Sequence, residues 1–504
     1  MSRYFFVVVF YCFIGLPSIA WSATYHVATY GSDDAIGTGS VKYPWATITH
    51  ALDSVEDGSV IEVHPGTYNG RIRIRGTFAR GVTVRSQTPY QARLRNSGTV
   101  ITAYADDARG VSGITLEGFD IAHSGSGAGA LVVHIDGDGN NAVKNITLKN
   151  NILHDSYNND ILKINNSCTN ILVRGNMFYN QTGSDEHIDI NSVSDVTVED
   201  NIFFNDFEGS GRTNRNNTSS YIVIKDSNGS ADMFTGSRNI TVRRNIFLNW
   251  QGSTGTNFIL AGEDGQPFYE AFDVLVENNL LLGNSGNVMR APFGVKGCRD
   301  ITFRNNTVSG DLPALAYGMR LNREGSNPAN ANIRFYNNVW DDQTGTMGAE
   351  NPSRPNDFSD TPPADTTSFV LANNLYWNGG AAIPEDPAEL INPSDDTSRL
   401  IANPLLPAPV FITLPRWVEI SNRFADNSGT ISQAFRKLIA FATPAKGSPL
   451  IDHADPAFAP VDDILGNIRS SKPDVGAFEF NPVPEGNPPK EKFTVAPMLL
   501  LLEN

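Results

Sequence analysis

A ten-residue sequence phrase recurs along most of this 504-residue chain and constrains the fold more than any other feature. Copies such as NITLKNNILHD, from Asn145, and NILVRGNMFYN, from Asn170, place an apolar strand on each side of a polar turn. One turn Asn recurs at positions 151, 176, 201, 245, 279, 306, 338 and 374. The shortest step between them, 25 residues, is one coil of a repeat architecture, and longer steps are coils with inserted loops.

Each copy is too small to bury its apolar face alone, so the copies must stack. Stacked coils form a continuous interior of Ile, Val, Leu and Phe, while the turn Asn side chains form a ladder that satisfies backbone groups. We therefore predict an all-β fold: a right-handed parallel β-helix (solenoid) with three short strands in each coil. A β-propeller blade needs roughly 40 regular residues, and a leucine-rich repeat needs a leucine skeleton that is absent here.

The chain divides into five parts around the repeat. We predict a signal peptide over residues 1–23, an N-terminal helical cap and first coils over 24–110, the β-helix core over 111–378, a C-terminal capping segment over 379–480 and a loose tail over 481–504. The amphipathic stretch Trp45–Val55 would form the cap helix, because an open solenoid end exposes apolar surface and unpaired strand edges. We expect residues 403–480 to close the opposite end.

Charge and composition exclude some classes of protein. The 38 basic and 54 acidic residues give a net charge of −16, which argues against non-specific nucleic-acid binding. The apolar run Tyr4–Ile19 follows Arg3 and is typical of a secretory signal rather than a membrane span. We therefore expect a secreted or periplasmic protein with no membrane span, and a monomer.

Two cysteines follow the predicted signal, Cys168 and Cys298. Each stands two residues before a copy of the phrase, but the two copies are four repeats apart. At roughly 4.8 Å per stacked strand they would lie about 19 Å apart. A disulfide requires Cα atoms within about 7 Å, so we predict two free, buried thiols.

The strand that precedes each copy carries a row of charged residues. Its aliphatic residues point inward, so the alternate residues point outward and stack into a groove suited to a polymer. Charged residues on this face include Lys163, Asp189, Lys225, Glu263, Asp264, Arg290, Arg320 and Arg323. The repeat alone does not require this much charge.

Four carboxylates are predicted to gather on this face. Asp160 and Asp185 are 25 residues, or one coil, apart, so their carboxylates should lie about 5 Å from each other. Glu186 and Asp189 add further oxygen ligands. Four adjacent carboxylates repel one another unless a cation lies between them, and hard oxygen ligands favour Ca²⁺. Alternatively, Asp185 and Glu186 form a solvated turn and Asp189 is a surface strand residue.

The opening motifs YHVATYGSD, PWATI and PGTY, followed by β-helix coils, resemble the secreted family 9 (pectate-lyase-like) polysaccharide lyases. In that family an Asp one coil before an Asp-Asp-x-x-Asp cluster binds Ca²⁺, and a catalytic Lys follows. The resemblance implies Ca²⁺ ligands at Asp160, Asp185, Glu186 and Asp189, and a catalytic Lys225, 36 residues beyond Asp189. The SPLID and DVGAFE patterns near the C-terminus resemble a module at the end of many bacterial secreted β-helix proteins.

We therefore predict a Ca²⁺-dependent polysaccharide lyase that cleaves a pectate-like or alginate-like uronic-acid polymer by β-elimination. The reaction removes the C5 proton, and Ca²⁺ stabilises the charge that develops on the adjacent carboxylate. Neighbouring cations and partial burial should lower the pKa of Lys225, the base, and activity should be highest at alkaline pH. Arg290 is predicted to be a second catalytic residue beside Lys225, and the residues predicted to bind substrate are Lys163, His187, Arg320 and Arg323.

Other assignments stay open. Lys163 is a rival base, because it points outward one coil from Asp189. A glycoside hydrolase would use Asp160 with Asp185 or Asp189 as acid and base. A uronan C5-epimerase would share the proton abstraction, and a non-catalytic glycan-binding solenoid would carry these charges only as a solvated wall.

Overall fold

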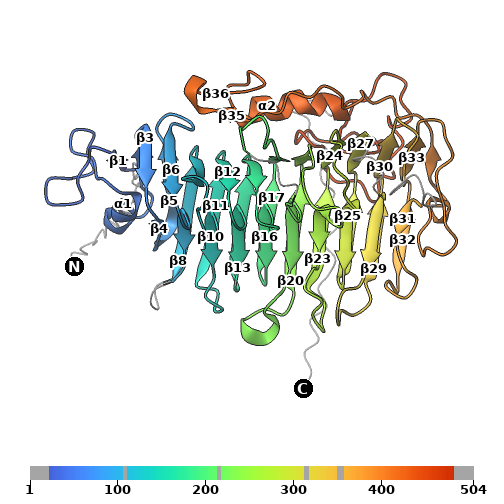
Figure 1. Cartoon of the computed structure of the whole chain (residues 1–504), viewed down its shortest axis with the longest axis horizontal. Helices are drawn as coiled ribbons and strands as arrows, with labels where there is room; N and C mark the ends of the chain where they lie inside the picture. Colours follow the sequence, from blue (N-terminus) through green and yellow to red (C-terminus); the bar gives the residue numbers. More distant parts are fainter. Residues whose placement is uncertain (1–21, 106–109, 213–216, 311–316, 349–356, 482–504) are drawn as a thin grey trace, which may run out of the picture.

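The computed structural model describes residues 22–105, 110–212, 217–310, 317–348 and 357–481. The chain is a parallel β-helix, as predicted, in which successive strands enter three long sheets in turn (Figure 1). Sheets A and B have twelve strands each and sheet C has ten. Every neighbouring pair within these sheets is parallel, as the pairs around β16 illustrate.

The strands are as follows. Sheet A contains β1 (Thr24–Val27), β2 (Val60–Val63), β5 (Gly76–Ser86), β8 (Val111–Glu117), β11 (Val143–Lys149), β14 (Thr169–Arg174), β17 (Ser194–Glu199), β20 (Ser237–Arg243), β23 (Ala271–Glu277), β26 (Arg299–Arg304), β29 (Ala331–Tyr336) and β32 (Phe369–Ala372). Sheet B contains β3 (Gly66–Asn69), β6 (Ala92–Asn96), β9 (Asp120–His123), β12 (Ile152–Ser156), β15 (Met177–Gln181), β18 (Ile202–Phe204), β21 (Ile246–Phe247), β24 (Leu280–Gly283), β27 (Thr307–Gly310), β30 (Val339–Asp342), β33 (Leu375–Asn378) and β34 (Leu400–Ile401). Sheet C contains β4 (Ile72–Ile74), β7 (Ile101–Ala103), β10 (Val133–Asp136), β13 (Leu162–Asn165), β16 (Ile188–Asn191), β19 (Ile222–Lys225), β22 (Asn257–Ala261), β25 (Ala291–Lys296), β28 (Met319–Asn322) and β31 (Ser359–Asp360).

Each copy of the repeated phrase forms one strand of sheet A, a turn and one strand of sheet B, and the preceding strand lies in sheet C. Inward side chains from the three sheets form one long core of aliphatic and aromatic residues. Aromatic rings repeat from coil to coil inside it: Phe178, Phe203 and Phe247 stack with centroid distances of 5.0 and 4.9 Å. The interior is therefore continuous along the helix axis, as the repeat requires.

The Asn ladder forms at the turn between sheets A and B. The backbone N–H of Asn176 donates to Oδ1 of Asn201 at 2.8 Å, and its Nδ2 donates to the Leu148 carbonyl at 2.9 Å. The same bonds join each of the eight predicted positions to the next, and all eight side chains are fully buried. The ladder ends at Asp396, whose Oδ2 accepts the N–H of Asn374 at 2.9 Å.

Helix α1 (Ile48–Ser54) lies beside the first strands (Figure 1). Thr47 caps its N-terminus by accepting the His50 N–H, and Ile48, Ala51 and Leu52 are buried in the main core. The predicted amphipathic helix is thus present, shortened at both ends from the predicted Trp45–Val55.

The C-terminal segment corrects one prediction. It contains the hairpin β35 (Trp417–Val418) and β36 (Arg423–Phe424), helix α2 (Ile431–Leu438), and the 3₁₀ turns Glu419–Ser421 and Ile439–Ala442. Instead of closing the far end, it runs along the outer face of sheet B toward the N-terminal coils (Figure 1). That face carries apolar residues such as Ile152, Tyr179 and Phe204, which pack with Trp417 and Phe435 in a second core. Apolar residues on both faces of sheet B explain why the segment lies there.

Residues closer to the repeat cover the last strand of sheet C. Ile391 is buried in the main core, with Ile383 and Leu390 packed against it. The Leu390 N–H donates to the carbonyl of Thr361, directly after β31, at 2.8 Å. Two further 3₁₀ turns lie at Gly229–Ala231 and Pro393–Asp395.

Cys168 and Cys298 are free and buried, as predicted. No helix within the described ranges is long and apolar enough to cross a membrane. Residues 1–21 of the predicted signal peptide and residues 482–504 of the predicted tail lie outside the described residues.

Candidate functional site

The outer face of sheet C carries the candidate site. One row of side chains in register across its strands reads Arg73, Thr102, His134, Lys163, Asp189, Val223, Leu260, Gly294, Arg320 and Asp360. The alternate residues, such as Ile222 and Ile224 of β19, lie in the core, as the predicted alternation requires. Charge is therefore concentrated toward the two ends of the row, with Val223, Leu260 and Gly294 between.

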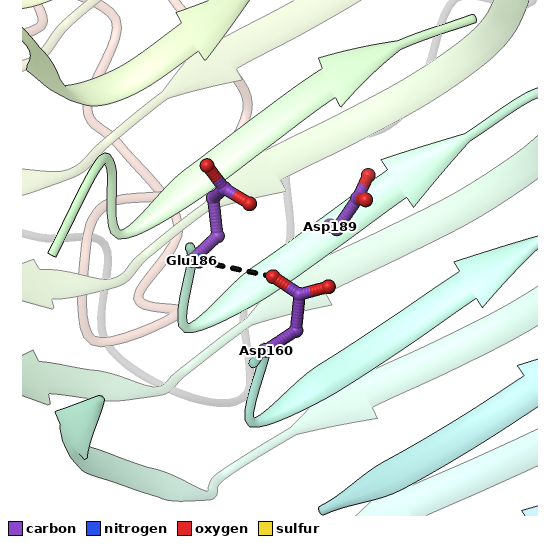
Figure 2. A group of neighbouring side chains, drawn as sticks. All are labelled: Asp160, Glu186 and Asp189. Carbon is purple, nitrogen blue, oxygen red and sulfur yellow. Dashed lines mark hydrogen bonds between the residues drawn. The ribbon is translucent and has the colours of Figure 1, made fainter. Parts of the chain in front are cut away.

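Three carboxylates from two successive coils meet on this face, and one of them is Asp189 of the row. Asp160 lies just before β13, Glu186 just before β16, and Asp189 within β16 (Figure 2). One carboxylate oxygen from each residue lies within 4.8 Å of the others, and all three residues are buried. Asp160 Oδ1 accepts the Glu186 N–H at 3.0 Å, while Asp189 Oδ1 is buried and has no hydrogen-bond partner in the part of the chain that the structure describes. These three residues could hold a metal ion.

Asp185, the fourth predicted ligand, does not join this group. The predicted pairing assumed a 25-residue coil, which holds for the Asn ladder. In sheet C, however, Lys163 is paired with Asp189, 26 residues later, because the turn between sheets B and C contains one additional residue. Glu186 therefore takes the position next to Asp160, and the half-buried Asp185 instead accepts the Ser219 N–H on its carbonyl at 2.9 Å.

The cluster is electrostatically unfavourable without a cation. Burial and repulsion from Asp189 raise the pKa of Asp160 to about 7. Burial, followed by the charge of Asp160, raises the pKa of Glu186 well above its usual range. Desolvation and like charge disfavour the ionised carboxylates, so the protein would gain from a bound proton or cation here.

Lys163 supplies one positive charge. Its Nζ forms an ion pair with Asp189 and lies 3.8 Å from Asp160 Oδ2. Burial alone would lower the pKa of Lys163, but the carboxylates of Asp189 and Asp160 raise it. Lys163 thus lies within the carboxylate cluster and neutralises part of it.

Lys225 lies one coil further, at the end of β19. Its Nζ contacts Glu263 Oε2 at 2.6 Å and Asp264 Oδ1 at 3.5 Å. The sequence predicted a lowered pKa for Lys225, and in the metal-free protein this is wrong. Burial would lower that pKa, but the carboxylates of Asp189 and Glu263 outweigh burial and raise it above the ordinary lysine range.

His187 lies inside the core and does not face the groove. It is fully buried, its ring stacks on Tyr221 at a centroid distance of 4.3 Å, and its Nε2 pairs with Asn205 Oδ1 at 3.0 Å. Burial lowers the pKa of His187 to about 3. The predicted substrate contact is therefore wrong, because strict alternation of side chains begins only at Ile188, where β16 starts.

The three predicted arginines form a separate group toward the C-terminal coils. Arg290 and Arg320 share Asp360, with Nε–Oδ2 distances of 2.7 and 3.2 Å, and Arg323 pairs with Asp365 at 2.9 Å. Arg290 precedes β25, whereas Lys225 ends β19, with β22 between these strands. The two residues therefore lie at opposite ends of strands two positions apart, and the predicted action of Arg290 beside Lys225 does not fit this geometry.

From the sequence we predicted no role for Glu263 and Asp264, although we placed both on this face. In the structure they follow β22 and hold the Lys225 amine. The charge of Glu263 also contributes to the raised pKa of Glu186, after burial and the charge of Asp160. Their only sequence signal was the placement of two acids directly after a strand of sheet C.

No protein-family model and no curated protein matches the sequence. Among solved structures, pectate lyase Pel9A matches with a TM-score of 0.50 and 14% identity, over 92% of this chain and 98% of that chain. XylC in complex with xylose gives 0.46 and 12%, over 91% and 98% of the two chains. The A-module of the Azotobacter vinelandii mannuronan C-5 epimerase AlgE4 gives 0.43 and 12%, over 75% and 100%. The likeness to Pel9A is one of fold, and the match extends over most of both chains.

Proposed function

We propose that this protein is a polysaccharide lyase that cleaves a uronic-acid polymer, pectate-like or alginate-like, by β-elimination with the help of Ca²⁺. The observation that carries the proposal is the group of three buried carboxylates, Asp160, Glu186 and Asp189, one coil from the Lys225 amine. The fold shared with a pectate lyase agrees with it. The secreted or periplasmic location expected from the sequence would bring the protein to such polymers.

The three carboxylates fit a hard divalent cation. They offer only oxygen ligands, they are buried, and Asp189 Oδ1 has no hydrogen-bond partner among the described residues. Asp160, Glu186 and Asp189 would hold Ca²⁺, and Lys163 would have to move away from Asp189 to admit it. Bound there, the ion would neutralise the carboxylate of a uronate and so acidify its C5 proton.

Lys225 would act as the base. Its neutral Nζ takes the C5 proton, the C5–H electron pair forms the C4–C5 double bond, and the C4–O bond breaks. The leaving oxygen then takes a proton from water. Because the carboxylates around Lys225 favour its charged form, the reactive neutral fraction increases with pH, and we expect the rate to rise from neutral to alkaline pH.

The arginine group would bind further uronate carboxylates of the polymer. Arg290 and Arg320 both contact Asp360, and their guanidinium groups could bind carboxylates on the face that a polymer would follow. The positive group would help an acidic protein to hold an acidic chain.

The test is incubation with polygalacturonate and alginate, with Ca²⁺ or with a chelator, followed by the ultraviolet absorbance of the conjugated double bond. We expect absorbance to rise only with Ca²⁺. Lys225→Ala should lower the rate by about 100-fold to 10,000-fold, the usual contribution of a general base, and Lys163→Ala by less. Full activity in chelator or in Lys225→Ala would contradict the proposal, and a larger loss in Lys163→Ala would make Lys163 the base.

A retaining glycoside hydrolase is the second candidate, because Asp160 and Glu186 lie close together and the pKa of Asp160 is raised to about 7, as a general acid requires. New reducing ends without the conjugated double bond would favour it. Inversion at C5 without chain cleavage would identify an epimerase, and binding without turnover would identify a glycan-binding solenoid.

A further inference from the structure

The amine of Lys225 is held by a loop whose conformation a buried carboxylate maintains. We propose that Glu263 positions the Lys225 amine for proton transfer, and that Glu270 fixes the loop that carries Glu263. This inference rests on the proposed lyase function, which assigns no role to either residue.

Glu263 is well placed to hold the amine. Its Oε2 lies 2.6 Å from Lys225 Nζ, and its Oε1 lies 3.5 Å from Ser219 Oγ. The carboxylate thus contacts both β19 and the turn that precedes it. The Lys225 side chain is 12% exposed and that of Glu263 is 22% exposed. A four-carbon lysine chain would otherwise sample many rotamers, and a charged partner at this distance selects one of them.

The loop itself is built around Glu270, which is fully buried. Glu270 Oε2 accepts the N–H groups of Glu263 and Asp264 at 2.8 and 3.0 Å. Its Oε1 accepts the Gln266 N–H at 3.1 Å and Asn327 Nδ2 at 2.8 Å. A buried carboxylate is costly unless donors satisfy both oxygens, and here four donors do so, three of them backbone groups of this one loop.

Gly262 sets where the loop leaves the sheet. Its N–H donates to the Ile224 carbonyl at 2.7 Å, which places it beside Lys225. Its φ is +79°, and a Cβ there would lie 1.7 Å from the Lys296 carbonyl oxygen, so only glycine fits. The chain therefore turns away from β22 beside the end of β19 and brings the Glu263 carboxylate to the Lys225 amine.

The pair serves the reaction in two ways. Before proton transfer it holds Nζ at a fixed place near the carboxylate cluster. After Nζ has taken the C5 proton, the resulting ammonium is stabilised by the same carboxylate and can pass a proton through Glu263 to water. The charged groups around Lys225 are Asp185, Glu186 and Asp189 from the preceding coil, Lys163 from the coil before that, and Glu263 and Asp264 from the next coil.

The chain offers a matched control pair on the same face. Lys296 ends β25 as Lys225 ends β19, and it contacts Glu324 Oε2 at 2.5 Å. Glu324→Gln therefore removes the same kind of ion pair on β25, two strands from β19, and leaves in place the Glu324 backbone that packs against Gly265 of the loop. Any effect common to both Gln variants would be a general consequence of losing one surface ion pair.

The experiment compares Glu263→Gln, Glu263→Ala and Glu324→Gln on polygalacturonate and alginate with Ca²⁺. In Glu263→Gln the amide oxygen can still accept a hydrogen bond from the Lys225 amine, but the negative charge is lost. The pKa of Lys225 should therefore fall, and the acidic limb of the kcat/KM profile should move to lower pH by about one unit or more. In Glu263→Ala the amine loses its closer partner and keeps only the longer contact with Asp264, so kcat should fall by about tenfold to a hundredfold with KM nearly unchanged. Glu324→Gln should change neither. A wild-type pH profile in Glu263→Gln, or a wild-type kcat in Glu263→Ala, would overturn the inference.

A second measurement does not depend on turnover. Lysine amines labelled by reductive ¹³C-methylation can be titrated by NMR, with the Lys225 signal assigned from its loss in Lys225→Arg. The titration midpoint of Lys225 should fall in Glu263→Gln and stay constant in Glu324→Gln. Absence of elimination by the wild type would reject the proposed function alone, whereas an unmoved Lys225 midpoint would reject the positioning role of Glu263 alone.

Discussion

His154 shows how the fold stabilises a charged side chain away from the candidate site. It lies in β12, where Nε2 contacts Asp120 Oδ1 and Nδ1 contacts Asp155 Oδ2, each at 2.8 Å. Arg95 and Arg212 pair with the same two carboxylates at 2.7 and 2.8 Å. Burial would lower the pKa of His154, but Asp120 and Asp155 overcome it and raise the pKa to about 9.

This network predicts a pH-dependent stability. The raised pKa means that the contribution of His154 is fully present below its unfolded value of 6.5 and is lost as pH rises through about 9. The stability difference between wild type and His154→Gln should therefore shrink, by on the order of 3 kcal/mol, between those two pH values. Urea unfolding at both ends of the range measures it. The exposed His453→Gln is the control, and an unchanged difference for His154→Gln would refute the prediction.

At the scale of single elements, the Asn ladder between sheets A and B holds the coils in register. A ladder Asn such as Asn176 accepts the Asn151 N–H and donates Nδ2 to the Leu148 carbonyl, both in the preceding coil, and its own N–H donates to Asn201 in the next coil. The side chain thus satisfies backbone groups that the turn would leave unpaired. The 34-residue and 44-residue steps do not interrupt it, because the inserted loops leave from other positions of the coil. The ladder therefore keeps the turn constant while loops vary.

Removing one ladder residue should destabilise the middle of the solenoid. Asn201→Ala deletes the acceptor of the Asn176 N–H and the donors to the Val173 carbonyl and Asn245, all of them buried. Unpaired buried polar groups cost about 1–3 kcal/mol each, so we expect a loss of roughly 2–4 kcal/mol and a lower thermal midpoint by calorimetry. The exposed Asn140→Ala should leave the midpoint unchanged. Equal midpoints for both variants would argue against a stabilising role of the ladder.

At the scale of the whole molecule, the C-terminal segment that covers sheet B contributes to stability. Trp417 is 6% exposed and packs against Tyr90 and Phe424, with ring centroids 5.1 and 5.0 Å apart. Ion pairs of Arg244 with Asp462 and of Arg416 with Asp206 fasten the segment at two further places. It thus shields an apolar sheet face that would otherwise contact water.

Trp417→Ala should release this segment before the coils unfold. Truncating a buried Trp costs about 3–5 kcal/mol, and the loss falls on the contact between the segment and sheet B. Limited proteolysis should then cut within residues 400–480 while the repeat stays intact, and an apolar dye should bind. Phe411→Ala, which removes a fully exposed ring from the same segment, serves as control. Uniform proteolysis of the whole Trp417→Ala chain would contradict the idea of a separable cover.

The sequence by itself determined the solenoid, its ladder and the face that carries the charged groove. These follow from periodicity, because a unit that cannot bury its own apolar face must stack, and because alternation within a strand fixes which side chains point outward. The phrase also held a signal for the cover of sheet B: its second strand, as in MFYN or IFFN, is apolar on both faces.

Which side chains contact one another at the turns could be seen only in the tertiary structure. Turn lengths between sheets B and C placed Glu186 rather than Asp185 next to Asp160, and turned His187 into the core. Folding also joined Lys225 to Glu263, 38 residues later, and kept Arg290 away from both. The physical reason is that side chains alternate between the two faces of a strand with a period of two, so their direction can be read from the sequence. In a turn, the direction of each side chain depends on the local backbone angles and on the length of the inserted loop, which no such period predicts.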